Sequence, residues 1–138
     1  MAFDADRIAL LRDQLAALRR DAPDAPSEFY HALFRIAPEL RPMFRDEDIG
    51  GQGAKFMATL GLLVARLSHP EAMHAELVEL GRGHAAYGVK PRHFEPMREA
   101  LIETLRASLG EAFDAESEDA WRALYDRAAA EMIAAPGR

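Results

Sequence analysis

Hydrophobic residues recur every three or four positions along almost the whole chain, which is the period of an amphipathic α-helix. The pattern predicts six sizeable helices, over about residues 4–20, 26–37, 51–67, 71–84, 91–109 and 114–132. Two prolines within 38–44 predict a short 3₁₀ turn there, and 45–51 predicts a polar loop. In no segment do polar and apolar residues alternate convincingly with the period of a strand, so we expect an all-α fold.

Composition narrows the class of protein. The 138 residues suffice for a single domain over 1–138 with a full core. The absence of cysteine excludes disulfides, thiolate zinc sites and cysteine nucleophiles, and the net charge of −6 speaks against nucleic acid as a partner. No apolar run approaches about 18 residues, and the N-terminus lacks the features of a secretory signal. We therefore expect a cytoplasmic protein with no membrane partner.

One histidine stands out because it lies on an apolar helix face. His84 shares a helical face with Leu77, Leu80 and Gly81, since residues three and four apart stack on one side. A neutral imidazole in such a position is a common protein ligand for iron and zinc. A core histidine whose nitrogens are hydrogen-bonded within the protein gives the same pattern, so this stretch alone leaves both interpretations open.

Two further polar side chains fall on inward faces. Gln52 heads the apolar stripe of the 51–67 helix, and Tyr30 shares its face with Phe34. The Tyr30 hydroxyl needs a hydrogen-bond partner if it is buried. Gln52 could equally hydrate the first turn of its helix, so its role also stays open at this point.

The order and spacing of these landmarks resemble a globin. Tyr30 precedes Pro38 by eight residues, Pro38 precedes Phe44 by six, and Gln52 precedes His84 by 32. The segment His-Ala-Ala-Tyr-Gly-Val-Lys-Pro at 84–91, followed by Phe94, is similar to the proximal segment of neuroglobin and of single-domain bacterial haemoglobins. The segments 109–113 and 120–125 resemble the start of their last helix. The resemblance extends from about residue 8 to 132 and implies a 3-over-3 helical sandwich around one haem.

The resemblance also implies roles for particular residues. His84 would ligate the iron through one ring nitrogen and donate from the other to a backbone carbonyl near Leu80. Tyr30 and Gln52 match the distal pair that donates hydrogen bonds to bound O₂ in many bacterial globins. The residues expected to contact haem are Phe44, Lys55, Phe56, Leu80, Tyr87, Val89, Phe94 and Met97. Among them, Lys55 and Tyr87 would meet the propionates, although Lys55 could also be an ordinary solvated lysine.

The chain departs at several positions from the families that it resembles. Gln52 stands where neuroglobin has a second histidine, which implies an iron that is five-coordinate without added ligand. Phe94 stands where flavohaemoglobins have a tyrosine, and Ala135 and Pro136 occupy the region of their proximal glutamate. The cofactor implied is haem b, held without a covalent bond because Cys-x-x-Cys-His is missing. We expect His93, at a helix start, to lie in solvent.

The leading function that follows is reversible binding of O₂ and of other diatomic gases such as NO and CO. The alternative is NO dioxygenase activity that depends on a separate reductase, because no flavin or nicotinamide segment follows within the sequence. A weak peroxidase and a gas or redox sensor are further alternatives, and a plain helical interaction domain is the alternative without haem. A monomer and a homodimer are both compatible with the sequence.

Overall fold

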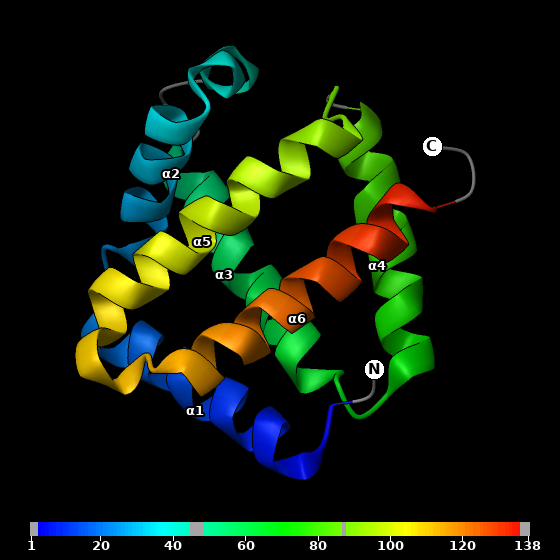
Figure 1. Cartoon of the computed structure of the whole chain (residues 1–138). Helices are drawn as coiled ribbons and strands as arrows, with labels where there is room; N and C mark the ends of the chain where they lie inside the picture. Colours follow the sequence, from blue (N-terminus) through cyan, green and yellow to red (C-terminus); the bar gives the residue numbers. More distant parts are fainter. Residues whose placement is uncertain (1–2, 45–48, 87, 136–138) are drawn as a thin grey trace.

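The computed structural model describes residues 3–44, 49–86 and 88–135, with the side chains of 49–52 left aside. Within these residues the chain is built of helices and turns, without a strand (Figure 1). The elements, in order, are α1 (Ala5–Asp21), α2 (Ala25–Ile36), η1 (Pro38–Met43), α3 (Ile49–Ala65), α4 (Pro70–Ala86), η3 (Pro91–His93), α5 (Phe94–Leu109), η4 (Gly110–Ala112) and α6 (Ala115–Ile133). The all-α prediction, the six helices and the 3₁₀ turn after α2 are confirmed.

Side-chain caps fix the ends of two helices. The Asp4 carboxylate accepts a hydrogen bond from the Arg7 N–H at 2.8 Å, and the Asp114 carboxylate accepts one from the Ser117 N–H at 2.9 Å. Each bond satisfies a backbone donor that a helix start otherwise leaves without a partner. The helix predicted over 91–109 begins with the 3₁₀ turn η3, in which the His93 N–H donates to the Lys90 oxygen three residues earlier, at 2.9 Å.

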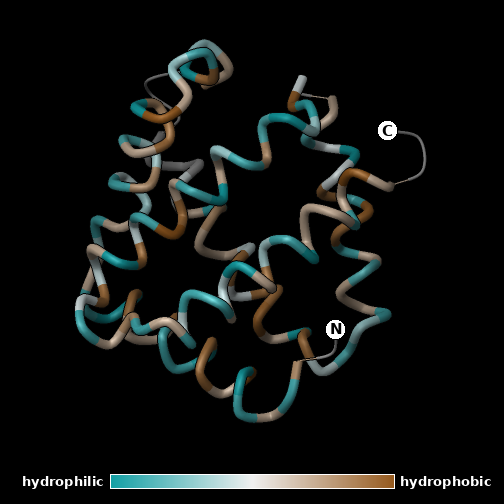
Figure 2. Tube along the Cα trace, viewed as in Figure 1, coloured by the Kyte–Doolittle hydropathy of each residue, from teal (hydrophilic) through white to brown (hydrophobic). Residues whose placement is uncertain are grey.

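The helices form two crossing layers around a shared core. In Figure 1, α5 and α6 lie in front of α3, with α1 along the base and α4 at the right. The principal contacts join α2 to α5 and α3, α4 to α6, and α1 to α3, α5 and α6. Figure 2 shows hydrophobic and hydrophilic positions alternating around each helix, as packing on one side requires. No helix of the described residues has the length and apolar character needed to cross a bilayer.

A buried polar link joins the first and last helices. The indole N–H of Trp121 donates to the Gln14 side-chain oxygen at 2.9 Å, and the Gln14 amide donates to the Ser117 hydroxyl at 2.8 Å. Trp121 is fully buried and Gln14 is 7% exposed. Because each buried donor has an acceptor, the network costs little and fixes one register of α1 against α6.

Two glycines let helices approach closely. A Cβ at Gly53 would lie 2.7 Å from the Pro26 Cβ, and a Cβ at Gly81 would lie 2.3 Å from the Met132 backbone oxygen. Gly81 therefore sets the distance between α4, which carries His84, and α6.

We expect Gly81→Ala to destabilise the protein, because the backbone of α6 cannot yield as a flexible side chain could. The free energy of unfolding should fall by about 1–3 kcal/mol, the usual cost of overpacking. Gly83→Ala is the matched control in the same helix, since a Cβ there meets no atom within 4 Å. That change should raise the free energy of unfolding by about 0.5–1 kcal/mol through helix propensity. Urea denaturation measures both, and equal effects would contradict the close crossing.

Candidate functional site

His84 lies in the last turn of α4 with a half-buried side chain. Its Nδ1 is 2.7 Å from the backbone oxygen of Leu80, one turn earlier in the same helix. A carbonyl oxygen only accepts, so Nδ1 carries the proton and the lone pair of the neutral ring lies on Nε2. The hydrogen bond expected from the sequence is present, and it fixes the orientation of the imidazole.

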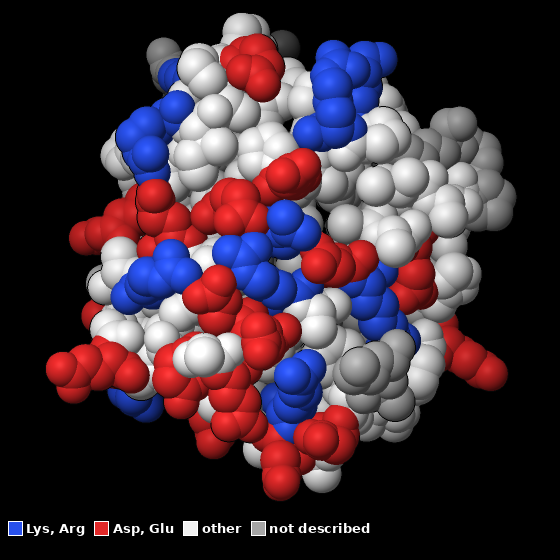
Figure 3. Space-filling model, viewed as in Figure 1, with Lys and Arg blue, Asp and Glu red and all other residues white. Residues whose placement is uncertain are grey.

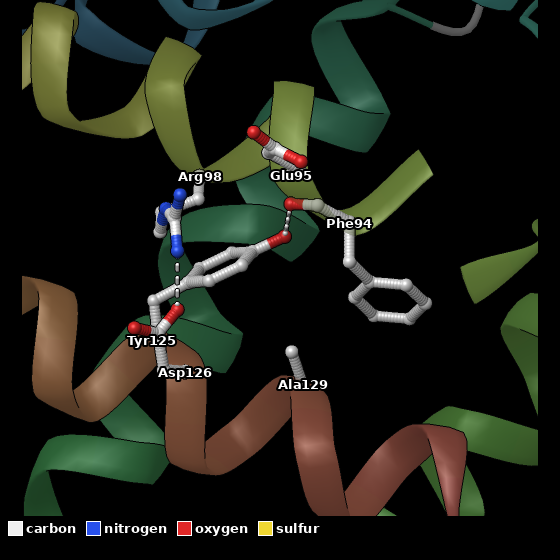
Figure 4. Close-up of a pocket in the computed structure, with 6 residues that line it drawn as sticks. All are labelled: Phe94, Glu95, Arg98, Tyr125, Asp126 and Ala129. Atoms are coloured by element: carbon white, nitrogen blue, oxygen red, sulfur yellow. Dashed lines mark hydrogen bonds and ion pairs between the residues drawn. The ribbon is translucent and has the colours of Figure 1, made fainter. Parts of the chain in front are cut away.

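Phe94 packs beside this histidine at the start of α5. The two ring centroids are 6.4 Å apart with planes inclined by 35°, and Phe94 is buried. The Tyr125 hydroxyl donates to the Phe94 backbone oxygen at 2.7 Å, and burial raises the pKa of that hydroxyl (Figure 4). Tyr125 therefore ties the start of α5 to α6, on the side of Phe94 away from its ring.

A pocket of about 250 Å³ lies between α5 and α6 on this side (Figure 4). Its lining residues are Phe94, Glu95, Arg98, Tyr125, Asp126 and Ala129. Arg98 forms ion pairs with Asp126 at 2.9 Å and with Glu99 at 2.8 Å, so its charge is already neutralised within the protein. None of the pocket's side chains is a metal-ligating histidine, and the pocket does not include His84.

The turn between α4 and α5 is held by hydrogen bonds on both sides. Gly88 adopts a φ of +88°, which suits a glycine, and the Val89 N–H donates to the His84 oxygen at 2.9 Å. The Lys90 N–H donates to His93 Nδ1 at 2.9 Å, while the His93 N–H donates back to the Lys90 oxygen at 2.9 Å. This reciprocal pair shapes the turn directly after the His84 helix.

The expectation that His93 lies in solvent is wrong, because only 7% of it is exposed. The ring turns inward to accept the Lys90 N–H, which would otherwise lack a partner at the start of η3. Burial lowers the pKa of His93, and the charges of Arg92 and Lys90 lower it further against an opposing effect of Glu39. His93 therefore acts on the shape of the turn as a neutral ring.

Aromatic side chains gather around Tyr30, on α2. Its ring centroid lies 5.1 Å from Phe29, 5.3 Å from Phe44 and 6.1 Å from Phe34. Phe29 also stacks on Phe56 of α3, with centroids 4.3 Å apart and planes inclined by 11°. Tyr30 is 6% exposed, and burial raises its pKa to about 12, so the hydroxyl stays protonated and can donate a hydrogen bond.

The structure brings the candidate residues together in two groups. Tyr30, Phe44 and Phe56 belong to the aromatic cluster, while Leu80 and Phe94 contact or bond with His84. Val89 is buried in the turn, Met97 is partly buried on α5, and Lys55 is exposed on α3. Gln52 belongs to α3, but its side chain and the whole of Tyr87 lie outside the described residues. Across the described residues, no aromatic contact joins the two groups.

The candidate metal-binding side chains suit a metal ion that already has most of its ligands from its own cofactor. Among the described residues, no three His, Cys, Asp or Glu side chains lie close enough to hold a metal ion together. Zinc sites use three or four protein ligands, whereas a haem iron takes four nitrogens from its macrocycle and one from a histidine. A single oriented imidazole and a largely apolar surrounding therefore fit haem.

The sequence interpretation missed several contributors to this arrangement. Phe29 makes the closest ring contact of the cluster, and its spacing of four from Leu33 showed only that it faces the core. Tyr125 reaches Phe94 across 31 residues, so no local signal pairs them. The sequence around His93 indicates nothing about which way its ring turns.

Comparisons with known proteins agree with this fold. The family model that matches is Globin, over residues 27–132. Neuroglobin of Tetraodon nigroviridis is 36% identical over 75% of this chain and 73% of its own length. An anaerobic nitrite reductase of Brassica napus is 29% identical over 94% of this chain and 89% of its own. The flavohemoprotein of Deinococcus radiodurans is 28% identical over 91% of this chain, which spans 32% of that protein. A bacterial globin of Campylobacter jejuni has the same fold, with a TM-score of 0.81, 24% identity and 94% of both chains covered.

Proposed function

Because the chain belongs to the globin family, we propose that it binds haem b without a covalent bond and takes up O₂ reversibly, together with NO and CO. The observation that carries this proposal is the hydrogen bond from His84 Nδ1 to the Leu80 oxygen at 2.7 Å. It leaves Nε2 as the ligating atom and orients it, as the second partner of a metal-bound histidine usually does. The cysteine-free sequence leaves no side chain for thioether attachment.

When bound, haem would supply an iron atom that takes up a diatomic gas. The protein's own contribution is to bury the macrocycle and exclude water. We assign the apolar contacts to Phe44, Phe56, Leu80, Val89, Phe94 and Met97, which are buried or partly buried. Removing apolar surface from water contributes roughly 25 cal/mol per Å². We assign the propionates to Lys55 and Tyr87.

Hydrogen-bond donors opposite His84 would stabilise the negative charge that O₂ acquires as a ligand. Tyr30 is suited to this role because its buried hydroxyl stays protonated. Gln52 would be the second donor, from the first turns of α3. A glutamine amide is a poor iron ligand, so Gln52 would not compete with a gas for the iron. Two donors favour tight O₂ binding with slow release.

A second candidate function is NO dioxygenase activity with electrons from a separate reductase in the cytoplasm. The observation that favours it is the similarity to the Deinococcus radiodurans flavohemoprotein over 91% of this chain. Phe94 opposes it, because it stands where flavohaemoglobins carry a tyrosine beside the proximal histidine. The named activity of the Brassica napus relative makes nitrite a further substrate to assay.

The visible spectrum of the purified protein tests the main proposal. We expect a Soret band with haem bound at one per chain, and a five-coordinate, high-spin ferrous spectrum in the absence of gas. The reason is that Gln52 supplies no strong sixth bond. Exposure to O₂ should give a stable oxygenated spectrum that reverts under vacuum. A low-spin ferrous spectrum without gas would contradict the open position, and failure to take up haem would overturn the proposal.

A further inference from the structure

Positive and negative charges are unevenly distributed along this chain. The two longest stretches without Asp or Glu are residues 49–70 and 80–94. They include α3 and the end of α4, the two elements that carry Gln52 and His84. They also contain both lysines of the chain, Lys55 and Lys90. These two stretches therefore carry only neutral and basic side chains, although the net charge of the whole chain is −6.

Lys90 and Arg92 form an exposed basic corner between α4 and α5. Most arginines of the described residues are neutralised by ion pairs, namely Arg20, Arg35, Arg66, Arg82, Arg98, Arg106, Arg122 and Arg127. Neither member of the basic corner forms an ion pair with any residue that the structure describes. Figure 3 shows a compact blue patch at the α4–α5 turn, while most red side chains of that face lie below it.

Hydrogen bonds hold the backbone of the basic corner, which is directly connected to the site. The reciprocal hydrogen bonds between Lys90 and His93, both 2.9 Å, hold its backbone, and Pro91 restricts it further. The Val89 N–H bonds to the His84 oxygen on one side, and Phe94 follows on the other. Charged side chains on a preorganised turn lose less freedom on binding than those on a mobile loop.

We propose that the basic corner is the docking surface for an acidic electron-donor protein that reduces the iron. The inference rests on the proposed function. One electron leaves the reduced donor, an iron–sulfur or flavin protein, and one ferric haem becomes ferrous. An acidic donor is repelled by most of this anionic protein and attracted at the corner, next to the segment that carries His84. Attraction at one place and repulsion elsewhere select a single orientation of approach.

Charge reversal at the basic corner tests the inference. The variant is Lys90→Glu/Arg92→Glu, and the control is Arg7→Glu/Arg12→Glu on α1, which changes the net charge equally. The probe is an acidic plant-type [2Fe–2S] ferredoxin. Its affinity in the oxidised form is measured by calorimetry, and its rate of reducing the ferric haem by stopped flow. At about 20 mM salt we expect both to fall about tenfold or more in the corner variant, and less than twofold in the control. At about 0.5 M salt the three proteins should converge.

Other outcomes would overturn the inference. If affinity and reduction rate fell equally in the two variants, the donor would respond to net charge alone. If they were unchanged in the corner variant, the donor would dock elsewhere. If a neutral free flavin also reduced the corner variant more slowly, the substitutions would have altered the haem itself. If the oligomeric state of the corner variant changed, the basic corner would be a contact between two copies of this chain. Faster haem loss from the corner variant would show that the basic corner binds the haem propionates. Absence of a Soret band before any donor is added would overturn the proposed function itself.

Discussion

Replacing His84 by alanine is expected to abolish the histidine-type haem spectrum while leaving the helical fold intact. The side chain is half-buried and its only described hydrogen bond is to the Leu80 oxygen in its own helix, so its loss removes no tertiary hydrogen bond. Loss of an outer-shell partner typically lowers metal affinity 10–100-fold, so loss of the ligand itself should accelerate haem transfer to an acceptor protein by more than about 100-fold. Haem retention, the Soret band and far-UV circular dichroism measure these effects.

His31→Ala is a suitable control, because His31 is exposed on α2 and should leave the spectrum unchanged. Apolar burial can retain some haem even in the His84→Ala protein. Added imidazole should then restore a histidine-type spectrum by filling the vacated space. A spectrum that stays histidine-type without imidazole would contradict the assignment. It would direct attention to His93, the histidine that the structure buries.

The fold followed from the sequence because its signals are local and repeated. The period of hydrophobic positions, together with prolines at 38, 70 and 91, determines where helices begin and end. The one departure at a helix start is also local, because the chain forms the 3₁₀ turn η3 over Pro91–His93 before α5 begins. Gly53 permits the close crossing of α3 and α2, because a Cβ there would lie 2.7 Å from the Pro26 Cβ.

The site was less accessible from sequence, because its geometry depends on contacts between distant residues. The His84–Leu80 hydrogen bond could be predicted, since it lies within one helical turn. The Tyr125–Phe94 bond joins two helices, and the direction of the His93 ring depends on a reciprocal bond with Lys90. Helical periodicity assigns a residue to a face, but it does not determine what the side chain meets there. The distal role of Gln52 stays a prediction.

The strongest expected effect on gas binding comes from Tyr30. Its ring is held by Phe29, Phe34 and Phe44, so the position of the hydroxyl is well defined. Burial keeps the hydroxyl protonated, since it raises the pKa to about 12. No described residue forms a hydrogen bond with this hydroxyl. The hydroxyl of a tyrosine that is only 6% exposed needs a partner, and bound O₂, or water in its absence, would be that partner.

Tyr30→Phe removes the donor while keeping the ring and its aromatic contacts. If the hydrogen bond to O₂ contributes about 1–3 kcal/mol in a dry site, the O₂ dissociation rate should rise roughly five- to a hundredfold. CO is far less polar as a ligand, so its dissociation rate should change much less and serves as the internal control.

Gln52→Leu should act in the same direction but more weakly, because an amide in the first turns of a helix is held less firmly. Stopped-flow dissociation of O₂ and CO from the parent and both variants measures these effects. An O₂ dissociation rate within twofold of the parent in Tyr30→Phe would show that the hydroxyl does not contact the ligand, and equal changes for O₂ and CO would indicate an altered pocket shape instead of a lost hydrogen bond.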